Sequence, residues 1–306
     1  LVLATGFDFI GFQIGTSEFT KPNEAKMLSW LNLAMKHLDV THPSVEPFAW
    51  IHITCGLEQE SGAPYYHLPL QADEKLGAFV HTTMFYDLEH PAPVYDCDNF
   101  THQKVFFDES DGRRALVYFP ETAWWLGFDN NLPQVTPIAA RSRSHDIIDV
   151  LPAWSVEGHV TFTTGREWTY WQYDHYLSRV TWDGRTDWKS YLKWLAPIYG
   201  ENGGAVVTLI EWWTERQWRD FYETNPEIYF YLSGELPQDE LGAAAGIIAR
   251  PPKRSFISIR DMGDDEFEKW TSKDFKMLEV MLSEYSKAFD PLVEPTKDGP
   301  YSEVYW

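Results

Sequence analysis

Short apolar runs alternate along the first two thirds of the chain with longer segments in which apolar residues recur at helical spacing. The short runs predict strands at 6–15, 48–54, 78–85, 114–119 and 159–164. The longer segments predict helices at 23–38, 100–110, 137–150 and 188–198, with a weaker helical stretch at 70–76. Because the strand runs are apolar almost throughout, they predict a parallel sheet covered on both faces.

The last third of the chain has a different pattern, which is helical almost throughout from Ala205 onward. The predicted helical segments include 209–222, 240–249 and 273–289, and the Pro-rich tail at 290–306 is irregular. We therefore predict a barrel-type domain over 1–204 and a helical region over 205–306 that completes or decorates it. A doubly wound sheet also fits the pattern, but no GxGxxG or Walker-type loop follows any predicted strand. The fold class that we predict is α/β, a (β/α)8 TIM-like barrel.

The net charge bears on which partners the chain can bind, and the cysteines bear on its cellular compartment. The formal net charge is −21, so the surface repels phosphate backbones, and we expect neither nucleic acid nor an anionic membrane as a partner. No apolar stretch is long enough to span a bilayer. Cys55 and Cys97 could pair in an oxidising compartment, and Asn99-Phe100-Thr101 fits a glycosylation acceptor. We expect an extracytoplasmic protein whose signal peptide, if there was one, is removed before Leu1.

Residues with catalytic or binding chemistry gather at the predicted strand ends, where parallel α/β folds place their sites. Glu18 follows the first predicted strand and Glu121 follows the fourth. His52 and His81 lie in the second and third, and Tyr86 ends the third. Further candidates follow the fourth and fifth strands: Trp124, Trp125, Arg166, Glu167, Trp168 and Trp171. Aromatic residues make up 16% of the chain, and flat rings of this kind stack on the apolar faces of sugars.

Each candidate also has a structural interpretation. Glu18 could be a solvated loop acid or a helix cap, Glu167 could be an acid paired with Arg166, and both His52 and His81 could be buried histidines with satisfied hydrogen bonds. Glu121 lies among aromatic residues, where a carboxylate is costly unless it has a function. No histidine spacing typical of zinc sites and no GxSxG motif occurs, so we expect no cofactor and no metal.

The layout of strands and acids resembles the large clan of retaining glycoside hydrolases built on (β/α)8 barrels. In that clan an acid/base Glu follows strand four, a nucleophilic Glu follows strand seven and a Trp often follows strand eight. The resemblance implies that Glu18 is the acid/base, that Glu121 is the nucleophile and that Trp168 follows the last strand. The first three barrel strands would then lie upstream of Leu1 or on another chain, unless the first strand here is the first of the barrel. Ser17 stands where the clan usually has Asn.

Three functions remain open at this point. The first is an extracellular glycoside hydrolase that uses Glu18 and Glu121 in a Trp-lined cleft. The second is a non-enzymatic carbohydrate-binding or assembly subunit on a degenerate barrel, with a partner chain supplying strands. The third is a metal-dependent hydrolase that uses His52, His81 and nearby acids.

Overall fold

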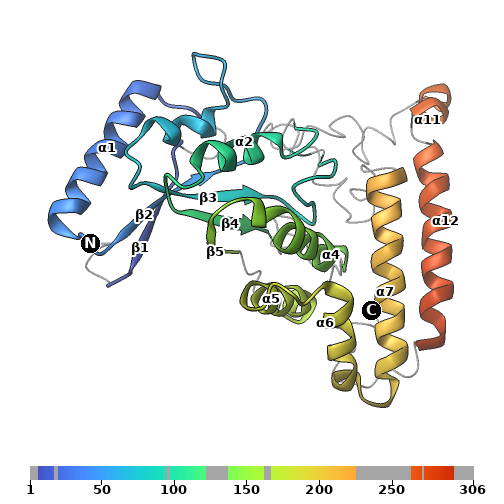
Figure 1. The fold of residues 1–306 in the computed structure, drawn as a ribbon. Helices are drawn as coiled ribbons and strands as arrows, with labels where there is room; N and C mark the ends of the chain where they lie inside the picture. The colour runs from blue at the N-terminus through green and yellow to red at the C-terminus, as the bar shows by residue number, and fades with distance from the viewer. Residues whose placement is uncertain are drawn as a thin grey trace. The chain divides into compact units, whose positions relative to one another are not determined.

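A computed structural model describes residues 6–16, 20–92, 94, 97–121, 137–161, 167–224, 263–270 and 272–292. The chain divides into two compact units (Figure 1). The first, which we call the sheet unit, comprises Leu1–Glu121 and Asp149–Thr161. The second, the helical unit, comprises Thr122–Ile148 and Phe162–Trp306. The domain boundary that the sequence predicts at 204 stays a prediction.

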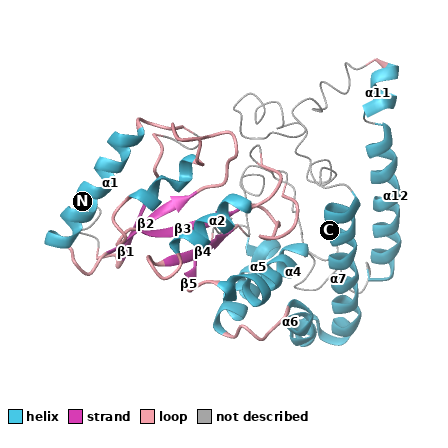
Figure 2. Ribbon diagram, turned by 45° about the horizontal axis from the view of Figure 1, so that its top comes forward, coloured by secondary structure: helices cyan, strands magenta, loops and turns pink. Residues whose placement is uncertain are grey.

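The sheet unit is built on five parallel strands in the order β1-β2-β3-β4-β5 (Figure 2). The strands are β1 (Phe9–Phe12), β2 (Glu46–Ile51), β3 (Gly77–Thr82), β4 (Leu116–Pro120) and β5 (Val156–His159). The parallel sheet that the sequence predicts is therefore present, but β1 is shorter than the apolar run at 6–15, and β5 begins before 159–164.

The predicted (β/α)8 barrel is wrong. The strands form one open five-stranded sheet, and in the described part of the chain β1 and β5 are its two edges. The error has a physical reason. Apolar strands that alternate with helices are expected in an open parallel sheet as well as in a barrel, because helices cover the strands in both. Closure depends on strand number and stagger, which the hydrophobic pattern does not encode.

Helices on one side of the sheet connect its strands. They are α1 (Glu24–Thr41), the 3-10 helix η2 (Tyr65–Gln71) and α2 (Thr101–Ser110). In α1, Asn23 caps the first turn by accepting a hydrogen bond from the Lys26 N–H, at 3.0 Å. Successive strands are added in one direction and parallel crossovers are right-handed, so the connecting helices lie on the same face (Figure 1). Contacts of η2 with β2 and of α2 with β3 agree with this arrangement.

The other face of the sheet is aromatic. The strand register places Trp50 beside Phe79, and it places His81 beside Phe119. The rings of Phe48 and Phe79 stack with centroids 4.6 Å apart. A Cβ atom at Gly77 would lie 2.6 Å from the Phe48 ring, so only glycine leaves room for that ring. His81, one of the candidate site residues, lies on this aromatic face near the carboxyl ends of the strands.

The helical unit consists of helices packed on one another, together with short connecting turns. Its helices are α4 (Ile138–His145), α5 (Glu167–Trp182), α6 (Trp188–Leu195), α7 (Gly203–Trp218), α11 (Asp264–Trp270) and α12 (Ser272–Phe289). The shorter elements of the two units are η3 (Asp146–Val150), η4 (Leu151–Ala153), η5 (Ala196–Asn202), η6 (Arg219–Thr224) and η7 (Asp290–Leu292). Helix α7 contacts α4, α6 and α12. The helix predicted at 240–249 lies outside the described residues.

The predicted absence of a membrane span agrees with the structure, since none of the helices within the described ranges has the length and apolar character that crossing a bilayer requires.

Candidate functional site

Glu121 lies directly after β4 at the carboxyl edge of the sheet. Its backbone N–H donates to the Thr82 carbonyl over 3.2 Å, which extends the pairing of β3 and β4 by one residue. The side chain points to the aromatic face, and the residue is only 7% exposed. A carboxylate so nearly buried needs hydrogen-bond donors, because burying an unpaired carboxylate costs on the order of several kcal/mol.

Both carboxylate oxygens of Glu121 have such a contact. His81 Nε2 lies 3.1 Å from Glu121 Oε1, and the backbone N–H of Met84 donates to Glu121 Oε2 over 3.0 Å. His81 comes from β3 and is fully buried. A histidine on one strand and a turn amide after that strand therefore fix the orientation of an acid on the next strand.

Met84 is the one non-glycine residue with positive φ in the described part of the chain, at 55°. The left-handed conformation costs a residue with a side chain roughly 1–2 kcal/mol, and it persists only when the surroundings impose it. Here it aims the Met84 N–H at Glu121. Strain of this kind is often found at functional sites, so the turn adds support for treating Glu121 as more than a buried acid.

Aromatic rings surround the histidine that contacts Glu121. The ring of His52, which directly follows β2, lies 4.8 Å from the His81 ring, and its Nδ1 is 2.7 Å from the Ile53 carbonyl oxygen. The Trp50 ring lies 4.9 Å from His52 and 5.4 Å from His81, and the Phe119 ring lies 4.9 Å from His81. The arrangement combines one oriented carboxylate with a wall of flat rings.

The chain after β3 carries a second buried acid. Asp87 is fully buried and accepts hydrogen bonds from the backbone N–H groups of Glu89 and His90, each at 2.9 Å. His90 Nδ1 lies 2.9 and 3.0 Å from its two oxygens. Burial alone would raise the pKa of Asp87, but the contacts with His90 and these backbone groups outweigh it and lower the pKa below its ordinary value. Tyr86, the preceding residue, is also fully buried.

A disulfide between Cys55 and Cys97 joins the loop after β2 to the loop after β3, with the two Cα atoms 5.0 Å apart. His102, in the first turn of α2, places its Nδ1 3.7 Å from the Cys55 sulfur. Burial lowers the pKa of His102 below its ordinary value. The two loops that frame His52 and Tyr86 are thus tied to each other.

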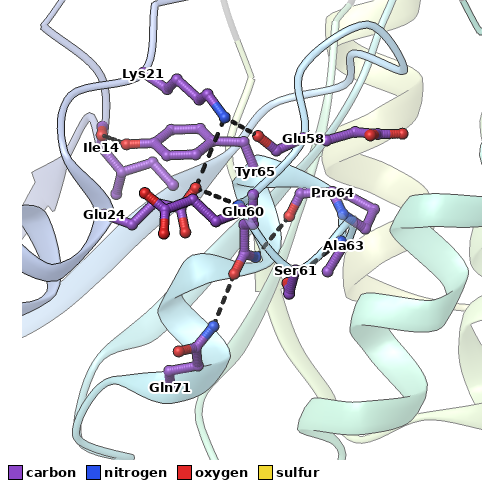
Figure 3. A network of polar contacts seen from close by, with 11 residues as sticks. Ile14, Lys21, Glu24, Glu58, Glu60, Ser61, Ala63, Pro64, Tyr65 and Gln71 are labelled. Atoms are coloured by element: carbon purple, nitrogen blue, oxygen red, sulfur yellow. Dashed lines mark hydrogen bonds and ion pairs between the residues drawn. The ribbon is translucent and has the colours of Figure 1, made fainter.

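A network of polar contacts fixes the remainder of the loop after β2 (Figure 3). The Tyr65 hydroxyl donates to the Ile14 carbonyl over 2.6 Å. The pKa of Tyr65 is raised to about 12, and burial is the largest cause of this shift. Glu24 of α1 accepts from the Glu60 N–H at 2.8 Å, and Lys21 donates to the Glu58 carbonyl. This network holds the loop against α1 and the chain that follows β1.

The structure brings together only part of the set that the sequence singles out. Glu121, His81 and His52 meet at the carboxyl edge of the sheet, and Tyr86 follows β3. Trp171 is half-buried in α5 of the helical unit. Glu167 and Trp168 begin α5 instead of ending a strand, and their side chains lie outside the described residues. Four candidates lie outside them entirely: Glu18, Trp124, Trp125 and Arg166.

Sequence reasoning missed three residues that lie in or near the site. Trp50 precedes His52 by two residues on the same strand face, so the two-residue period of a strand could have found it. His102 lies in the first turn of a predicted helix and carries no local signal of its proximity to Cys55. Met84 has no sequence signal either, because a left-handed methionine cannot be read from residue type.

Comparison of the chain with protein-family models, curated proteins and solved structures found no match.

Proposed function

We propose that this chain acts on carbohydrate as a glycoside hydrolase and that Glu121 is its nucleophile. The observation that carries the proposal is the near-complete burial of Glu121 at the carboxyl edge of a parallel sheet, with both oxygens held. An ionised carboxylate is an acceptor only, and contacts of this kind orient it. Such a group is suited to attack an electrophilic carbon, whereas a general acid must carry a proton on one of its oxygens.

In the proposed reaction, a Glu121 oxygen attacks the anomeric carbon and the glycosidic bond breaks as its oxygen takes a proton. Water then hydrolyses the glycosyl-enzyme and releases the sugar with retained configuration. Aromatic side chains at this edge, Trp50 among them, supply flat surfaces for sugar rings.

Glu18 stays the proposed proton donor, but the open sheet changes what that role requires. Two strands, β2 and β3, separate β1 from β4. At about 4.8 Å between neighbouring strands, the ends of β1 and β4 are roughly 14 Å apart in a flat sheet. A retaining pair has its carboxyl groups about 5–5.5 Å apart. Glu18 must therefore reach Glu121 through the loop that follows β1, and the proposal rests on Glu121.

The setting that we propose is extracytoplasmic. The Cys55–Cys97 disulfide supports it, because such bonds persist in oxidising compartments. The net charge of −21 is compatible with a neutral sugar substrate and unfavourable for a polyphosphate.

The test is Glu121→Gln, assayed for hydrolysis against a panel of aryl glycosides and polysaccharides. Gln keeps the size and the acceptor oxygen but removes the nucleophile, so turnover of any substrate that the native chain cleaves should fall by at least about a thousandfold. Glu46→Gln is the matched control, since Glu46 is an exposed acid at the start of β2, away from the carboxyl edge of the sheet where Glu121 lies. If Glu121→Gln and Glu46→Gln both retain native activity, Glu121 is not the nucleophile.

A second candidate function is carbohydrate binding without cleavage. It is favoured by the two contacts that already engage Glu121, because a carboxylate held in this way can serve as a fixed acceptor for sugar hydroxyls. In that case a glycan would change the tryptophan fluorescence of the native chain while no product appears, and Glu121→Gln would weaken binding only.

A further inference from the structure

The cysteines of the disulfide and His102 form a compact group of potential metal ligands. Cys55 follows β2, Cys97 lies in the loop after β3, and His102 lies in the first turn of α2. Their two sulfurs and one ring nitrogen all lie within 4.8 Å of one another. Two thiolates and an imidazole are a donor set that suits zinc.

One ligand-to-ligand distance in this group already fits a tetrahedral ion. Zinc–sulfur bonds of about 2.3 Å and zinc–nitrogen bonds of about 2.0–2.1 Å place a sulfur and a nitrogen ligand roughly 3.5 Å apart. The distance from Cys55 Sγ to His102 Nδ1 is 3.7 Å. The two sulfurs, which are bonded to each other in the disulfide, must separate to accept the ion.

His102 is held in place by a contact outside the group. The backbone of His102 is anchored to η2. Its carbonyl oxygen lies 2.9 Å from His67 Nε2 of η2. This contact fixes the backbone position from which the His102 ring reaches Cys55. Cys55 and His102 are half-buried rather than enclosed, so a small reductant and a hydrated ion can reach them.

We propose that reduction of the Cys55–Cys97 disulfide by a small thiol converts this group into a zinc site. Two thiol molecules reduce the disulfide to two cysteine thiols and are themselves oxidised to one disulfide. Zn²⁺ then binds the two sulfurs and His102 Nδ1, and both thiol protons are released to solvent. Three protein ligands leave a fourth position for water.

The consequence is that the loops after β2 and β3 are joined in both redox states. In the oxidised state a covalent bond joins them, and in the reduced state the ion does. This inference does not rest on the proposed hydrolase activity, since none of the three ligands is assigned a role in it.

The test uses the full chain, reduced with dithiothreitol, freed of it without air, and titrated with Co²⁺ as a spectroscopic substitute for Zn²⁺. We expect one Co²⁺ per chain, with thiolate-to-cobalt absorption that Zn²⁺ abolishes, and no binding to the oxidised chain. His102→Ala should weaken binding by more than about tenfold, as loss of a ligand must exceed the effect of losing an outer contact. His37→Ala, which alters an exposed histidine on α1, is the control and should bind as the native chain does.

Reduction could also unfold the sheet unit, so near-ultraviolet circular dichroism accompanies each titration. In that case metal should restore the circular dichroism signal of the folded state in the unsubstituted chain and in His37→Ala, but not in His102→Ala. The proposal is overturned if the reduced, folded chain takes up no Co²⁺, if metal fails to restore an unfolded chain, or if His102→Ala and His37→Ala bind with equal affinity.

Discussion

Replacing His81 with Phe removes the histidine contact of Glu121 while it retains a ring in the same place. The Phe ring can keep the packing that His81 has with Trp50 and Phe119, at 5.4 and 4.9 Å between centroids. What is lost is the contact between His81 Nε2 and Glu121 Oε1, at 3.1 Å. Because His81 is fully buried and Glu121 is 7% exposed, water cannot easily replace the lost partner.

The magnitude follows from the charge and burial of the pair. A hydrogen bond to a charged group contributes about 1.5–3 kcal/mol, and removal of one partner of a buried pair can cost about 3–5 kcal/mol. The Met84 N–H still donates to Glu121 Oε2 in this variant. We therefore expect a loss below the value of about 3–5 kcal/mol for a buried charge left with no partner. His81→Phe should therefore lower the free energy of unfolding by about 2–3 kcal/mol.

A double-mutant cycle with Glu121→Met isolates the pair, because Met is similar in length to Glu but has no acceptor oxygen for His81. Urea unfolding is followed by circular dichroism and by tryptophan fluorescence, and coincident transitions check that a single free energy describes each variant. The double variant should be more stable than the sum of the two single effects implies, by about 1.5–3 kcal/mol. A coupling energy within about 0.5 kcal/mol of zero would refute the reasoning that this contact holds Glu121.

Two further predictions concern the sheet unit. Burial lowers the pKa values of His67, His102 and His159, so the unfolded chain binds protons that the folded chain does not, and stability should fall as the pH drops below the ordinary histidine value of 6.5. Thermal unfolding measured between pH 7.5 and pH 5 should show this decline, and a flat or rising midpoint would contradict it. Replacing Cys55 and Cys97 together by Ser removes a cross-link between residues 42 apart, which should cost about 4 kcal/mol by the loop-entropy relation. Urea unfolding of that variant measures the loss, and a stability equal to that of the oxidised native chain would show that the cross-link contributes nothing.

The parallel sheet and the meeting of His52, His81 and Glu121 could be predicted from the sequence. Apolar runs marked the strands, and parallel strands bring their carboxyl ends to one edge, so residues distant in sequence meet there. The side-chain period of two then places Trp50 with His52 on one face.

The barrel and the start of α5 could not be predicted in the same way. Strand number and stagger decide whether a sheet closes, and neither is encoded in apolar periodicity. Among the side chains that the structure describes, the buried stripe of α5, which includes Tyr173, Tyr176 and Leu177, begins several residues after Glu167. Apolar periodicity therefore does not place Glu167 and Trp168 in the helix, although they begin it. The left-handed Met84 depends on the tertiary surroundings that impose it.

The most direct test of Glu121 as a nucleophile is mass spectrometry of the chain after incubation with activated 2-deoxy-2-fluoro glycosides, which form a glycosyl-enzyme that turns over slowly. The sugar should be that of a substrate that the native chain is found to cleave. We predict one covalent sugar per chain, on the peptide that contains Glu121, and none on Glu121→Gln. Labelling of a different carboxylate, or hydrolysis of the parent substrate without any label on that peptide, would contradict the assignment.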